Sequence, residues 1–142
     1  MHEAKKILKD IKRKQNNIKR LTRDIERLRE QEATVRTSEI SPTKVVTSKY
    51  NHHEQKLVNM ITLVEHKQKQ IMNLVMEIDR ELDIIYSLQE PYATMLDLRY
   101  IQGQPMKVVA YEVGYGKTQA NVLMNQALDN FLKRYKEQIK ST

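Results

Sequence analysis

Gly116, Lys117 and Thr118 have the residue types and the order that could hold a phosphate group. The nucleotide-binding loop G-x-x-x-x-G-K-[ST] ends in these three types, and its backbone N–H groups surround the phosphates. That loop needs a glycine five residues before Gly116, where this sequence has Tyr111. The preceding stretch, "MKVVAYEV", has helical spacing and is no strand. We therefore interpret "VGYGKTQA" as a turn between two helices.

Other residues that could carry chemistry are not suitably grouped. His52 and His53 are adjacent, so on a helix they point to different faces and cannot chelate one ion well. There is no cysteine, hence no thiolate ligand or nucleophile. Asp79, Glu81 and Asp83 fall on different faces of one helix, and we expect them at the surface. The sequence predicts no enzyme, no metal site and no cofactor.

The turn does match the requirements of a DNA-binding helix-turn-helix. A small residue in the first helix lets the second helix cross closely, and a glycine four residues later ends the first helix in the left-handed conformation. A small or aliphatic residue six positions further packs back on the first helix. Ala110, Gly114 and Ala120 have these spacings, and Gly116 falls at the N-cap of the second helix. A helical corner without any nucleic-acid role remains the alternative.

In such a motif the start of the second helix enters the major groove. The positions expected to face solvent there are Lys117, Thr118, Gln119, Asn121, Val122 and Asn125. Gln or Asn can pair with adenine, Lys with guanine or a phosphate, and Val can touch a thymine methyl group. Candidates for backbone phosphates are Arg99, Lys107, Lys133 and Arg134. For Arg99, a structural bond within its own domain is the competing interpretation.

Two long helices are expected before this motif. Apolar residues recur at heptad spacing through residues 4–35, with Lys14 and Glu32 as the only breaks. Residues 36–50 are rich in Ser and Thr and predict a loop, after which Asn51 would cap a second helix. The seam expected on that helix is Leu57, Ile61, Val64, Ile71, Val75, Ile78, Leu82 and Ile85, with Gln68 interrupting it. Its wide apolar stripe favours an antiparallel hairpin with a leftover flank; a parallel coiled coil between chains is the alternative.

Three more helices are expected in the last third of the chain. Pro91 should stop the second long helix, because the residue before a proline is pushed out of helical geometry. Residues 92–101 predict one helix, Pro105 suits the first position of the next, and a long amphipathic helix follows Gly116. The expected fold is all-α: a helical hairpin over residues 1–90, its loop at about 36–50, then a helix-turn-helix domain over residues 91–142.

The segment from Leu96 to Phe131 resembles region four of bacterial sigma factors and, more closely, small phage-encoded late-gene transcription activators of the RinA/ArpU type. The shared features are Leu98-Arg99-Tyr100, Gly103, Val109-Ala110, Val113-Gly114-Tyr115 and Ala127-Leu128. Those phage proteins also resemble the rest of the chain, with a charged first helix and a Ser/Thr-rich loop. The resemblance implies a sequence-specific activator of phage or prophage late genes.

Charge and hydropathy limit the kinds of partner that are expected. The net charge of +7 favours nucleic acid as a partner, and the helix-turn-helix indicates double-stranded DNA. A single such domain makes few contacts, so a homodimer is expected. No stretch approaches a membrane span or a signal peptide, which predicts a soluble, intracellular protein. The resemblance to phage proteins implies the cytoplasm of a bacterial host cell. A DNA-packaging recognition subunit like a small terminase, or an adaptor docking on host RNA polymerase, are the other functions left open. The basic first helix is either a second nucleic-acid surface or a solvated face.

Overall fold

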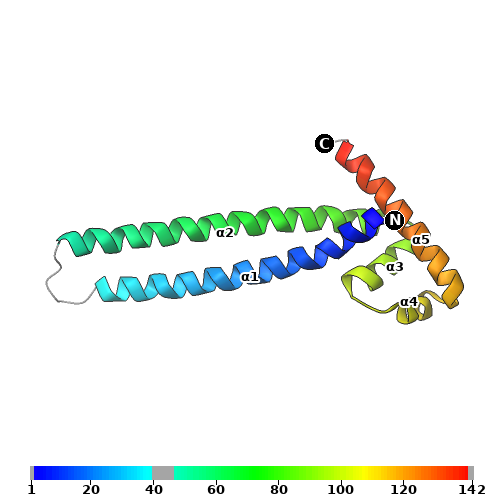
Figure 1. Cartoon of the computed structure of the whole chain (residues 1–142), viewed down its shortest axis with the longest axis horizontal. Coiled ribbons are helices and arrows are strands. Elements are labelled where there is room, and N and C mark those ends of the chain that lie inside the picture. The colour runs from blue at the N-terminus through cyan, green and yellow to red at the C-terminus, as the bar shows by residue number, and fades with distance from the viewer. Residues whose placement is uncertain (1, 40–46, 141–142) are drawn as a thin grey trace. The chain divides into compact units, whose positions relative to one another are not determined.

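All regular structure in the described residues is helical. The protein is represented by a computed structural model that describes residues 2–39 and 47–140 (Figure 1). Its elements are α1 (His2–Glu39), α2 (Thr47–Ser87), α3 (Tyr92–Leu96), the π-helical η1 (Asp97–Ile101), α4 (Met106–Val113) and α5 (Lys117–Lys140). The predicted all-α class is confirmed for these residues.

The chain divides into two compact units. The first unit joins residues 1–15 to residues 76–142, and the second contains residues 16–75. The first unit therefore takes residues from both sides of the expected boundary at residue 90. That boundary, as a division between an oligomerisation region and a DNA-binding domain, stays a prediction.

In the second unit, a segment of α1 and a segment of α2 lie side by side and run in opposite directions (Figure 1). The Nζ atom of Lys67 on α2 lies 3.4 Å from Oδ2 of Asp24 on α1. The buried apolar side chains of this unit are Leu21, Ile25, Val35, Met60 and Val64. An apolar seam with one crossing ion pair therefore joins the two segments.

The predicted loop at residues 36–50 is too long. The α1 helix continues to Glu39, and α2 already begins at Thr47, so Asn51 lies inside α2 instead of capping it. Residues 40–46, the middle of that loop, lie outside the described residues. The hydroxyls of Thr34 and Thr37 donate to carbonyls one turn back in α1, which lets these loop-favouring residues remain helical.

The inward face of α2 is also rotated from the predicted seam. Val64, Ile78 and Ile85 are buried as expected, but Ile61 and Val75 are exposed. At the alternate positions of the predicted seam, the side chain that faces inward is that of the residue one position earlier. These residues are buried or half-buried: Met60, Lys67, Leu74 and Glu81. The apolar pattern misses this register because two of its positions are charged. Each of those charges has an ion-pair partner on α1, which makes its burial tolerable.

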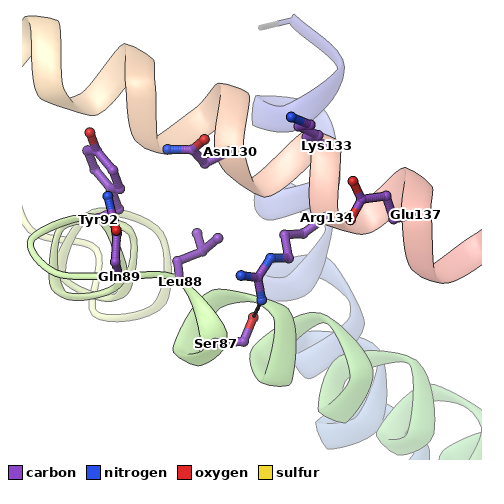
Figure 2. A pocket seen from close by; sticks show the side chains of 8 residues that line it. All are labelled: Ser87, Leu88, Gln89, Tyr92, Asn130, Lys133, Arg134 and Glu137. Carbon is purple, nitrogen blue, oxygen red and sulfur yellow. Dashed lines mark hydrogen bonds between the residues drawn. The ribbon is translucent and has the colours of Figure 1, made fainter.

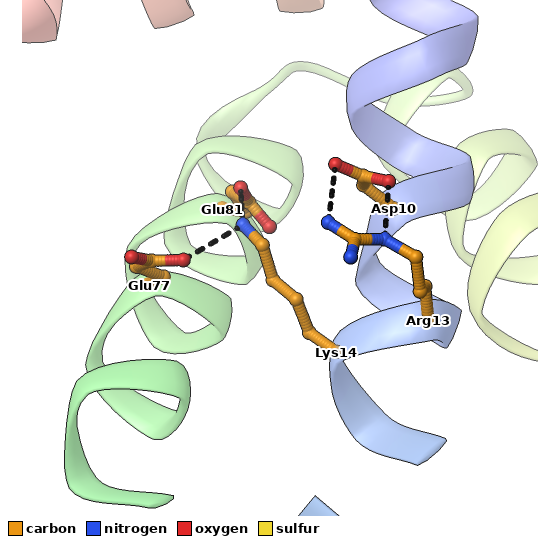
Figure 3. A network of polar contacts seen from close by, with 5 residues as sticks. All are labelled: Asp10, Arg13, Lys14, Glu77 and Glu81. Carbon is orange, nitrogen blue, oxygen red and sulfur yellow. Dashed lines mark hydrogen bonds and ion pairs between the residues drawn. The ribbon is translucent and has the colours of Figure 1, made fainter. Parts of the chain in front are cut away.

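In the first unit, Lys14 and Glu81 form a buried ion pair between the start of α1 and the end of α2 (Figure 3). The Nζ atom of Lys14 lies 2.7 Å from Oε1 of Glu81 and 3.2 Å from Oε2 of Glu77. The side chains of Lys14 and Glu81 are only 13% and 6% exposed. The expected surface position of Glu81 is therefore wrong. Lys14, which interrupts the apolar heptad pattern, is buried because it pairs with this carboxylate.

Burial and pairing act in opposite directions on Lys14. Burial disfavours its ammonium charge and by itself would lower the pKa, but hydrogen bonds to Glu81 and Glu77 outweigh this effect. The pKa of Lys14 therefore lies above its ordinary value. Nearby, the carboxylate of Asp10 accepts hydrogen bonds from Arg13, which lowers the pKa of Asp10 (Figure 3).

In the C-terminal part of the first unit, α3 and α4 pack against α5, and η1 packs against α3 and α4. The fully buried large side chains here are Met95, Leu96, Val109, Leu128 and Phe131. Two predicted boundaries move. The α2 helix ends at Ser87, ahead of Pro91, because the Ser87 hydroxyl caps the carbonyl of Ile84 and the chain then tightens into a turn. Pro105 is the N-cap of α4, since its extended ψ of 158° lies outside helical geometry.

Candidate nucleic-acid interface

The turn between α4 and α5 is built by two glycines. Gly114 has φ 78°, in the left-handed region that favours glycine, and it ends α4 as predicted. The N–H of Tyr115 donates to the carbonyl of Ala110 at 3.1 Å, which satisfies a carbonyl left over at the helix end. Gly116 precedes the first residue of α5 and accepts a hydrogen bond from the N–H of Ala120. The connection is thus a short, hydrogen-bonded corner.

The two alanines sit where the helices meet. Ala120 is 0% exposed and Ala110 is also buried, next to the fully buried Val109. A larger side chain at either alanine would push α4 and α5 apart, because protein interiors are close-packed. The expected role of these small residues is therefore in agreement with their burial.

All six candidate base-reading residues at the start of α5 are exposed. They do not share one face, because successive helical residues are rotated by about 100°. Thr118, Val122 and Asn125 lie along one line pointing away from the core. Asn121 lies on the flank nearer to α4, and Gln119 lies about 160° from it on the opposite flank. The structure therefore separates Gln119 from the residue with which it was grouped.

A shallow groove of about 500 Å³ runs between α4 and α5. Its lining residues are Met106, Lys107, Ala110, Tyr111, Tyr115, Lys117 and Asn121. The groove thus brings together three of the predicted residues: Lys107, Lys117 and Asn121. Two positive charges and one amide able to pair with a base line the same groove, an arrangement that suits an anionic partner.

Two tyrosines of this groove were missed as candidate contacts. Tyr111 is 83% exposed, and Tyr115 is exposed as well, although large aromatic side chains usually find cover. Their signal in the sequence is their spacing. Tyr111 stands one helical turn after Lys107, and Tyr115 stands directly after the glycine that ends α4. A phenol can stack on a base or donate its hydrogen to a phosphate.

The four predicted phosphate ligands do not form one group. Lys107 lines the α4–α5 groove, whereas Arg99 donates from its Nη1 atom to the carbonyl of Gln104 at 3.1 Å. The competing structural interpretation of Arg99 therefore applies, although Arg99 also lines a separate hollow together with three lysines of α1.

Lys133 and Arg134 lie far along α5, about 24 Å from Lys117 at 1.5 Å per residue. They line a pocket of about 420 Å³ together with Glu137 (Figure 2). Arg134 reaches to the end of α2, where its Nη1 atom lies 3.1 Å from Oγ of Ser87. The pocket thus contains a carboxylate, and Arg134 has a structural partner, so it is the weaker candidate for an anion.

Neither a metal site nor a membrane span is evident in the described residues. Within residues 2–39 and 47–140, no group of three or more His, Cys, Asp or Glu side chains could hold a metal ion. In the same ranges, no helix is both long and apolar enough to cross a membrane. Comparisons with protein-family models, curated proteins and solved structures find no match to this chain.

Proposed function

We propose that the chain is a sequence-specific DNA-binding regulator that reads the major groove with the first turns of α5. One observation carries the proposal. Ala110 and Ala120 are buried at the helix crossing, whereas every polar residue at the start of α5 is exposed. A helix held rigidly from behind, with polar side chains presented in front, is what base recognition needs.

The residues are assigned to different parts of the DNA. Asn121 pairs with an adenine edge, and Val122 contacts a thymine methyl group. Lys117 reaches a guanine or a phosphate, and Lys107 holds a phosphate from the other edge of the groove. Gln119 lies on the opposite flank of α5 and makes at most a backbone contact. This assignment gives a matched pair of amide residues for a test.

The test compares Asn121→Ala with Gln119→Ala. Binding would be measured by fluorescence anisotropy on a duplex selected from a random pool and on an unselected duplex. We expect Asn121→Ala to lose about 1–3 kcal/mol on the selected duplex alone, and Gln119→Ala to change little. Lys117→Ala should weaken both duplexes and flatten the salt dependence. Equal losses from the two amide variants on both duplexes would exclude base reading by this face.

The biological setting follows from the sequence resemblance. We propose a regulator of phage or prophage late genes, acting as an activator that meets host RNA polymerase at the promoter. Reporter transcription from the selected site, with and without the protein, tests the sign of regulation. Retention on polymerase without any DNA binding would instead select the adaptor.

The long helices are proposed to form an antiparallel hairpin that carries a homodimer. Support comes from exposed apolar residues along one flank of α2 in the second unit: Val58, Ile61, Met72 and Val75. A surface of this kind on a two-helix segment is suited to helix packing with a second copy. Sedimentation equilibrium distinguishes the outcomes: a dimer supports a regulator bound to two half-sites, and a ring of eight or more supports DNA packaging.

A further inference from the structure

A basic hollow of about 260 Å³ lies in the first unit, between the start of α1 and the segment from η1 toward α4. Its lining residues are Lys5, Lys9, Lys12, Arg99, Tyr100 and Gly103. Four of these six carry a positive charge, and none carries a negative one. The name basic hollow is used below for this set.

The three lysines of the basic hollow have no counter-ion in the part of the chain that the structure describes. Lys5, Lys9 and Lys12 follow one another at four and three residues, so they share one face of α1. None of them has an ion pair among the described residues, whereas Arg13 and Lys14 nearby are paired. Like charges one turn apart destabilise a helix by a few tenths of a kcal/mol per pair. Three unpaired lysines close to Arg99 repel one another, and this repulsion opposes folding unless an anion binds among them.

The nearby acids are already engaged. Asp10 holds Arg13, and Glu3 lies 3.4 Å from Lys136. Asp97 accepts hydrogen bonds from the hydroxyl of Tyr86 and from Nε2 of Gln102. The charge of the basic hollow is therefore not neutralised by the acids around it.

The rest of the basic hollow is shaped for a small ligand. Gly103 has φ 73°, and the Nζ atom of Lys12 lies 3.9 Å from the position that a β-carbon would take there. Tyr100 belongs to the π-helical turn η1, a wide turn often found at functional sites. Burial raises the pKa of Tyr100, although Arg99 opposes this, so its hydroxyl stays protonated and can donate.

We propose that the basic hollow binds one phosphate of the DNA backbone, beside the sequence read by α5. The inference rests on the proposed function for the source of that phosphate. Position supports it, because Gly103 belongs to the connection that enters α4, where Lys107 faces the groove. In three-helix DNA-binding domains, the loop before the second helix contacts the DNA backbone. The start of α1 then extends the DNA footprint beyond the helix pair.

The test compares two triple variants, each of which removes three lysine charges from a different unit. The variant Lys5→Gln/Lys9→Gln/Lys12→Gln is compared with Lys19→Gln/Lys56→Gln/Lys69→Gln, which replaces three exposed lysines of the second unit that have no ion pair among the described residues. Both change the net charge equally. We expect the first variant to bind the selected and the unselected duplex about tenfold more weakly, with a salt slope reduced by about 1. The second variant should bind like the wild type.

Folding and function are separated by two further measurements. Circular dichroism should show undiminished helix and stability in the first variant, because the replaced charges repel one another. If the wild type binds DNA and both variants bind it equally, the basic hollow is no phosphate site and the proposed function stands. If the wild type binds no DNA, the proposed function fails. Amide shifts of Tyr100 and Gly103 on titration with pyrophosphate would then keep the basic hollow as a site for a free phosphate, and unmoved amides would overturn it.

Discussion

The buried ion pair between Lys14 and Glu81 offers the sharpest test of how the first unit is held together. The perturbation is Lys14→Met, which removes the cation and keeps an unbranched apolar chain. The carboxylate of Glu81 would stay buried, and its Oε2 atom already has no hydrogen-bond partner. In the folded variant, the Glu81 carboxylate would be buried without its main partner, which is unfavourable for any ionised group.

The magnitude follows from the geometry. Two unit charges 2.7 Å apart attract by about 6 kcal/mol at an effective dielectric constant of 20. Desolvation of both side chains offsets part of this attraction in the wild type, but Lys14→Met leaves the desolvation of Glu81 in place. We therefore expect a loss of about 3–5 kcal/mol in the free energy of unfolding. The apolar pair Lys14→Met/Glu81→Leu should recover most of it.

The assay is urea unfolding followed by circular dichroism at fixed protein concentration, comparing midpoints at constant slope. Glu77→Gln is the matched control, because Glu77 also contacts Lys14 but its side chain is 46% exposed. Its loss should stay below about 1 kcal/mol. Equal losses for Lys14→Met and Glu77→Gln, or a double variant no more stable than Lys14→Met, would refute the reasoning.

Three further predictions concern backbone, packing and pH. Gly114→Ala should lower the free energy of unfolding by about 1 kcal/mol, because φ 78° disfavours a β-carbon although no neighbouring atom crowds that position. Gly116 has equal space and no positive φ, so Gly116→Ala should change the free energy of unfolding by under about 0.5 kcal/mol in the same urea assay. Ala120→Leu should cost about 1–3 kcal/mol and abolish DNA binding by separating α4 from α5, measured by urea unfolding and anisotropy; unchanged binding would disprove the close crossing. The raised pKa of Lys14 means that its ion pair contributes fully below the unfolded lysine pKa of about 10.4 and loses that contribution as pH rises through the folded pKa. The stability of the wild type relative to Lys14→Met/Glu81→Leu should therefore fall above about pH 10.4, and a constant difference to pH 11.5 would contradict this.

Local patterns in the sequence were sufficient for the elements of the α4–α5 corner. Gly114 ends α4 because only a residue without a β-carbon enters the left-handed region freely, and that property belongs to the residue itself. The alanines at 110 and 120 have the spacing of a helix-turn-helix, so that local pattern predicted their burial where α4 meets α5. Exposure at the start of α5 was predictable for the same reason.

Which residues of one helix meet another was decided by the tertiary structure. Ile61 and Val75 are apolar yet exposed, while Lys67 and Glu81 face inward, because charges on α1 stand opposite them. Burial of a charge depends on a partner far along the chain, and an apolar pattern read along one helix contains no information about that partner.

The tertiary structure also decided which residues come together on the two surfaces proposed to contact DNA. Sequence alone determined that the chain is helical, basic and provided with a tight corner between two helices. Only folding placed Asn121 beside Lys107 of α4, and only folding placed lysines from the start of α1 beside Arg99. Charge and amide groups can be counted in a sequence, but their convergence is a property of distances that the packed helices create.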